Sequence, residues 1–135
     1  MSDKSTVLRG FNHTFFEFVD DIIRIFPDNT DIKTTRTAFD FFKKANPTTI
    51  IKVWYHFISI PYKDIIMTGD ISFFFEKDYQ ADLAYMSNSA EIMAGIDRLR
   101  GPIKTMDESN KKTTTVYIQN LCKLSDVYNT LTATG

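Results

Sequence analysis

Apolar residues recur every three or four positions along each long segment of this chain. In the first such segment, about 6–26, this spacing aligns six large side chains on one helical face: Leu8, Phe11, Phe15, Phe18, Ile22 and Ile25. Steps of three and four are typical of an amphipathic α-helix, whereas a half-buried strand alternates at every second residue. The pattern therefore predicts an all-α fold, a single-domain compact helical bundle of five to seven helices.

The composition supports helical packing within one domain. The chain has 12 Phe and 6 Tyr but only 5 Gly and 4 Pro, so it buries large rings with few tight turns. A length of 135 residues suits one domain and is short for two. We therefore expect a single helical domain over residues 1–135, with a frayed tail at 132–135.

Capping residues and prolines mark the expected helix boundaries. A second helix should begin near Thr30 and end at Ala45, and a third should begin at Pro47 and stop before Pro61. The β-branched residues of the segment 50–60 leave a strand there as an alternative. The last helix should cover about 107–131 and pack against the first, because these two carry the longest apolar stripes.

The middle of the chain is harder to interpret. Residues 63–67 suit one helical turn closed by Gly69, and a short helix is expected over 78–86. A further apolar stripe runs through Gly101-Pro102 without losing its phase. Two interpretations remain, a kinked helix or two helices meeting at Gly101, and the unbroken phase favours the kinked helix.

The residues that carry catalysis in most enzymes are scarce and scattered. His13 and His56 form no metal-binding array, and the sequence has no glycine-rich phosphate loop, no nucleophile elbow and no paired cysteines. The single cysteine, Cys122, follows an apolar stripe residue and is interpreted as a buried thiol. We therefore expect no enzyme, no cofactor and no metal site.

Charge excludes some classes of function and leaves one alternative. The 16 basic residues nearly balance the 17 acidic ones, so the chain lacks the overall positive charge of a nucleic-acid coat protein. Arg98, Arg100 and Lys104 form a basic cluster that could contact phosphates, although a solvated helix surface is the favoured interpretation. The polar start 1–4 is unlike a signal peptide and no apolar run could span a bilayer, so an intracellular, reducing compartment is expected.

Some aromatic rings should point away from the core. The adjacent pairs 15–16 and 41–42 and the triplet Phe73, Phe74 and Phe75 cannot all face one core from one element, because neighbouring residues diverge in both helices and strands. The triplet lies in a connector, and connectors run along surfaces. We interpret these three residues as the partner-binding surface; the alternative is that the connector folds over the core and buries them.

Several stretches resemble small uncharacterised proteins of nucleocytoplasmic large DNA viruses, such as chlorella viruses and mimiviruses. The matching stretches are residues 15–23 with 25–27, 45–48 with 54–55, 69–75 with 78–79, and 117–121. The resemblance implies a viral protein located in the host cytoplasm or in the virion, and it brings no catalytic residues with it.

These observations lead to one functional hypothesis and one alternative. The hypothesis is a non-enzymatic viral structural or interaction protein, a minor capsid or virion-internal component acting through contacts with capsid proteins, other virion proteins or a second copy of itself. The alternative is a helical accessory factor in viral DNA replication or transcription, with Arg98, Arg100 and Lys104 as a weak nucleic-acid-binding face.

Overall fold

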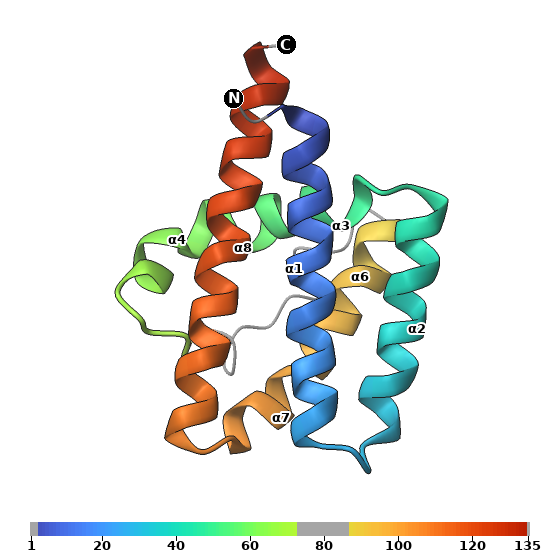
Figure 1. Cartoon of the computed structure of the whole chain (residues 1–135), viewed down its shortest axis with the longest axis vertical. Helices are drawn as coiled ribbons and strands as arrows, with labels where there is room; N and C mark the ends of the chain where they lie inside the picture. The colour runs from blue at the N-terminus through green and yellow to red at the C-terminus, as the bar shows by residue number, and fades with distance from the viewer. Residues whose placement is uncertain (1–2, 73–86, 135) are drawn as a thin grey trace.

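The computed structural model describes residues 3–72 and 87–134, and the regular secondary structure in these ranges is entirely helical. It forms one compact bundle, which confirms the predicted all-α fold (Figure 1). The elements, in chain order, are α1 (Lys4–Ile25), α2 (Thr30–Ala45), α3 (Thr49–Trp54), the π-helical turn η1 (Tyr55–Ser59), α4 (Ile60–Met67), α6 (Ser87–Arg98), α7 (Arg100–Thr105) and α8 (Glu108–Thr134).

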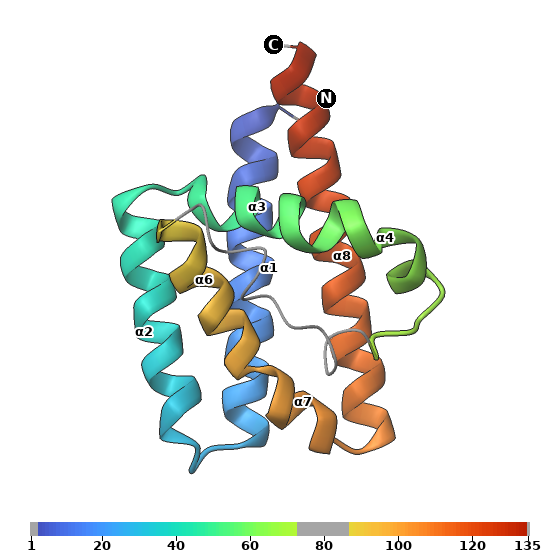
Figure 2. The same cartoon turned by 180° about the vertical axis from the view of Figure 1, so that it is seen from behind.

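The first and last helices pack side by side along the length of the bundle, as predicted (Figures 1 and 2). The ring centroids of Phe18 on α1 and Tyr117 on α8 are 6.1 Å apart. Helix α2 lies along the other side of α1, and α6 packs against α2. The continuous run of α3, η1 and α4 crosses behind α1 and α8, so the apolar faces of all these helices meet in one core.

Short polar side chains begin the long helices. The Asp3 carboxylate accepts a hydrogen bond from the Thr6 backbone N–H at 2.7 Å, and the Asn29 amide oxygen accepts one from the Ile32 N–H at 3.2 Å. Asp107 does the same for the N–H of Asn110 at 2.8 Å. Each cap satisfies an N–H that has no partner within its helix, so α1, α2 and α8 begin at these residues.

The third predicted helix differs from the structure at both ends. It begins at Thr49 rather than Pro47, because the Asn46 side chain instead accepts the Thr48 N–H in a local turn at 3.0 Å. It does not stop before Pro61, since η1 and α4 continue the helical run to Met67, and the strand alternative is wrong. Pro61 follows directly after the π-helical turn η1, in which the Ile60 N–H bonds to the Tyr55 carbonyl five residues earlier, so the helical run passes through the proline at a point where its hydrogen-bond pattern is already irregular.

Two further helix boundaries depart from the prediction, and one agrees with it. The predicted kinked helix is wrong: α6 and α7 are separate helices that part at Leu99, before Gly101. Pro102 cannot donate to the carbonyl four residues earlier and crowds it, which places the break upstream of the proline.

The last helix continues past Leu131, so the predicted tail is helical through Thr134. Gly69 ends α4 as predicted, with a φ of 91° that favours glycine.

An aromatic cluster at the centre of the core joins three helices. The ring of Phe15 on α1 lies edge-on to Phe39 of α2, with ring centroids 4.9 Å apart, and edge-on to Trp54 of α3 at 6.2 Å. All three side chains are buried. Edge-to-face pairs of this kind add to the stabilisation that burial of the rings already provides.

A glycine sets the close approach of α6 to α2. A Cβ atom at Gly95 would lie 2.8 Å from Cζ of Phe39 and 3.2 Å from Cγ2 of Thr35, both on α2. The first distance is shorter than carbon atoms tolerate, so any larger residue would push the helices apart. Gly95 therefore fixes the distance between these two helices.

We predict that Gly95→Ala lowers the free energy of unfolding by about 1–3 kcal/mol, because overpacking outweighs the better helix propensity of alanine. Gly10→Ala is the matched control, since a Cβ atom there meets only Cδ2 of Leu124 at 4.0 Å. The control should stabilise the protein by about 1 kcal/mol. Urea denaturation measures both changes, and equal stabilisation by the two variants would contradict the close approach at Gly95.

Candidate functional site

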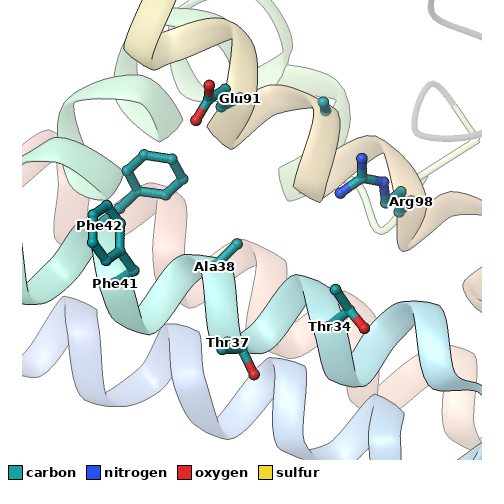
Figure 3. A pocket seen from close by; sticks show the side chains of 8 residues that line it. Thr34, Thr37, Ala38, Phe41, Phe42, Glu91 and Arg98 are labelled. Atoms are coloured by element: carbon teal, nitrogen blue, oxygen red, sulfur yellow. The ribbon is translucent and has the colours of Figure 1, made fainter.

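A groove of about 750 Å³ runs between α2 and α6 on the surface of the bundle. Its two walls come from separate segments of the chain (Figure 3). The lining residues on α2 are Thr34, Thr37, Ala38, Phe41 and Phe42, and those on α6 are Glu91, Ala94 and Arg98.

Helical periodicity explains why these residues share the groove. On α2 the side chains of Ile32, Thr35 and Phe39 are buried in the core, which leaves the stripe 34, 38 and 41 beside them at the rim. On α6 the buried residues are Ile92, Met93 and Ile96, and the stripe 91, 94 and 98 lies outside them. Both stripes have the steps of three and four that align residues on one helical face. The groove thus lies directly outside the packed seam of the two helices.

Phe41 is the most exposed large apolar residue among the described parts of the chain, with 68% of its surface accessible. Its ring lies edge-on to that of the half-buried Phe42, with centroids 5.8 Å apart (Figure 3). The prediction that the pair 41–42 would leave a ring outside the core is therefore confirmed. The same prediction is wrong for the pair 15–16, because both of those rings are buried between helices.

Opposite charges occupy the two ends of the α6 wall. Glu91 lies at the end near Phe42, and Arg98 lies at the end near Thr34 (Figure 3). Seven residues separate them, which is two helical turns or about 10 Å. Within the described ranges, neither side chain forms an ion pair. The groove therefore presents a negative charge and a positive charge, and neither has a counter-charge among the residues that the structure describes.

The residues expected to bind nucleic acid do not share one helix. Arg98 ends α6 and lines the groove, whereas Arg100 and Lys104 belong to α7. Arg100 forms an ion pair with Asp97, and Lys104 is exposed. The predicted partner-binding residues Phe73, Phe74 and Phe75, and the short helix expected over 78–86, lie outside the described residues.

A second hollow, of about 420 Å³, lies between α1 and α2 and has a basic lining. Lys43 Nζ is 4.8 Å and Arg36 Cζ 5.1 Å from the centroid of the Phe16 ring, so both cations lie over that ring. Arg36 also pairs with Asp20, its Nε lying 2.6 Å from Oδ1. Paired and ring-stacked cations of this kind stabilise the α1–α2 contact.

A polar cluster joins the turn η1 and α4 to α8. The Ser59 hydroxyl donates to Oδ1 of Asp126 at 2.6 Å, and Lys63 Nζ lies 2.5 Å from Oδ2 of the same carboxylate. The hydrogen bond with Asp126 raises the pKa of the Lys63 ammonium group, which therefore remains protonated at neutral pH. The lysine holds its proton and is therefore no nucleophile, and the Asp126 carboxylate that accepts from Ser59 is shared with Lys63.

Burial disfavours the nucleophilic thiolate form of Cys122. Its side chain is buried, and burial raises the pKa of the thiol to about 11. Within residues 3–72 and 87–134, no cluster of His, Cys, Asp and Glu is suited to hold a metal ion. The polar groups described above therefore form contacts within the fold, and the α2–α6 groove is the candidate functional site.

Comparisons with known proteins give no further guide to function. No protein-family model matches the sequence, and neither a curated protein nor a solved structure is significantly similar to it. No helix in the described part of the chain has the length and apolar character needed to cross a membrane. The interpretation of the groove therefore depends on its own geometry and chemistry.

The raised pKa predicts that Cys122 is inert in the folded protein. At pH 8 a thiol with a pKa near 11 is about 0.1% thiolate, against roughly a quarter for an unperturbed cysteine. We expect iodoacetamide to alkylate the native protein at least about 100-fold more slowly than the urea-unfolded chain. Mass spectrometry of timed samples measures both rates, and similar rates would place the thiol at the surface.

Proposed function

We propose that this chain is a non-enzymatic interaction protein that binds another protein through the α2–α6 groove. The observation that carries the proposal is Phe41, an aromatic side chain 68% exposed at the rim of a groove. Exposed aromatic residues beside a concave apolar surface are typical of protein-binding sites, because their burial yields a large free energy at low entropic cost.

The shape and charge of the groove define the partner surface that would fit it. Both walls are straight helical stripes, so a helix laid along the groove can contact them over its whole length. Apolar residues would face Ala38, Ala94 and Phe41, while a base and an acid would lie opposite Glu91 and Arg98. Such charge pairs select the partner and its direction in the groove.

The resemblance to proteins of large DNA viruses supports a structural role for this binding. In this proposal the protein is a minor capsid or virion-internal component, located in the virion or in the host cytoplasm, that is held by contacts with other virion proteins. The nucleic-acid alternative receives less support from the placement of the basic residues. Arg100 is already paired with Asp97, and Arg98 lines the groove instead of sharing a helix with Lys104.

We predict that Phe41→Ser weakens partner binding at least about 30-fold, as expected when an aromatic anchor worth about 2 kcal/mol is removed. Ile60→Ser is the matched control, because Ile60 is 60% exposed and lies on α4, away from the groove. Tagged versions of both variants and of the wild type would be purified from cells that naturally contain the protein, and the associated proteins compared quantitatively.

We expect Ile60→Ser to retain the proteins that associate with the wild type and Phe41→Ser to lose them. Both variants should unfold at nearly the wild-type urea concentration, since each residue is exposed. The opposite pattern, loss from Ile60→Ser alone, would move the binding surface to α4. Equal retention by all three proteins would remove the groove from partner binding.

A further inference from the structure

We infer that the protein seated in the α2–α6 groove is a second copy of this chain, in a two-fold symmetric dimer. The inference rests on the proposed function, because it names the partner of the same groove. It follows from two properties of the groove, the order of its charges and the order of its large and small side chains.

The charges of α6 are self-complementary. In a two-fold interface, a residue that contacts another across the axis is contacted by it in return. If α6 lies antiparallel to α6 of a second copy, Glu91 faces Arg98 of that copy and Arg98 faces its Glu91. Both pairs form together, because the two residues lie on one face of α6 and are centred near Ala94. Glu91 and Arg98 of one copy thereby neutralise Arg98 and Glu91 of the other.

The side-chain volumes follow the same symmetry. Small residues line both walls of the groove, Thr37 and Ala38 on α2 and Ala94 on α6, and they allow two copies to approach closely. On the α2 wall, Phe41 and Phe42 lie at one end and the smaller Thr34 lies at the other (Figure 3). The antiparallel arrangement places Phe41 and Phe42 of each copy opposite the Thr34 end of the α2 wall of the other copy.

This arrangement also covers the exposed ring. It brings Phe41 towards Arg98 of the second copy, where a guanidinium group can stack on the aromatic face. A different protein would have to supply an acid, a base and an aromatic anchor from its own sequence. A second copy of this chain supplies all three at the required spacing, so the groove is self-complementary.

A charge swap tests this inference directly. Sedimentation velocity from micromolar to millimolar concentration should show the wild-type chain passing from 15.6 kDa to twice that mass. Glu91→Arg and Arg98→Glu should each raise the dissociation constant at least about tenfold, because like charges then face each other. The double variant restores both opposite-charge pairs and should return to within about threefold of the wild type.

Lys104→Glu is the control for Arg98→Glu, since it also replaces a positive charge by a negative one. Lys104 is exposed and lies on α7, outside the groove. This control should leave the dissociation constant unchanged. Phe41→Ser tests the dimer interface without changing a charge, and this variant should also be monomeric. Circular dichroism of each variant verifies that the helices remain.

Two results would overturn the inference. One is a wild-type chain that stays monomeric at every concentration. The other is a double variant that dimerises no better than the single variants. If the chain is monomeric and Phe41→Ser still loses a different protein in the purification described above, the inference fails while the proposed function stands. If Phe41→Ser loses no protein and the chain is monomeric, both fail.

Discussion

The ring of Phe15 holds the bundle together, because it joins the first helix to both segments that follow it. Its edge-on contacts reach Phe39 on α2 and Trp54 on α3, so three helices are fixed at one point. The packing of α8 along α1 then covers the remaining apolar face of the first helix. Removing this ring would leave a cavity where the three helices meet, and α2 and α3 would lose the side chain that both of them contact.

The candidate groove depends on the same cluster through a single side chain. Phe39 contacts Phe15 on one side and lies against Gly95 of α6 on the other. Because Gly95 has no Cβ, α6 approaches α2 closely enough for the stripes outside the seam to face one groove. The positions of Phe41, Glu91 and Arg98 are therefore set by the core. A rigid core of this kind presents an interaction surface with little loss of conformational entropy on binding.

Sequence alone predicts the helices better than the surface they form. The stripe periodicity and the terminating Gly69 predict local structure correctly, because both depend on neighbours within one helical turn. The predictions at Pro61 and Pro102 are wrong, because the effect of a proline depends on its position within a helical turn. The helical run continues through Pro61, whereas it breaks before Pro102. The exposure of one ring at 41–42 follows from crowding within α2. The groove does not, because its second wall comes from α6, a segment about fifty residues further along the chain.

The central claim, that the α2–α6 groove docks a second copy, is tested most directly by amide NMR spectra of the wild-type chain over a dilution series. The account predicts concentration-dependent shifts for amides of residues 34–42 and 91–98, with amides around Ile60 unchanged. Such a pattern would place the contact on both walls of the groove at once. Spectra that do not change with concentration, or shifts centred on α4 instead, would contradict it.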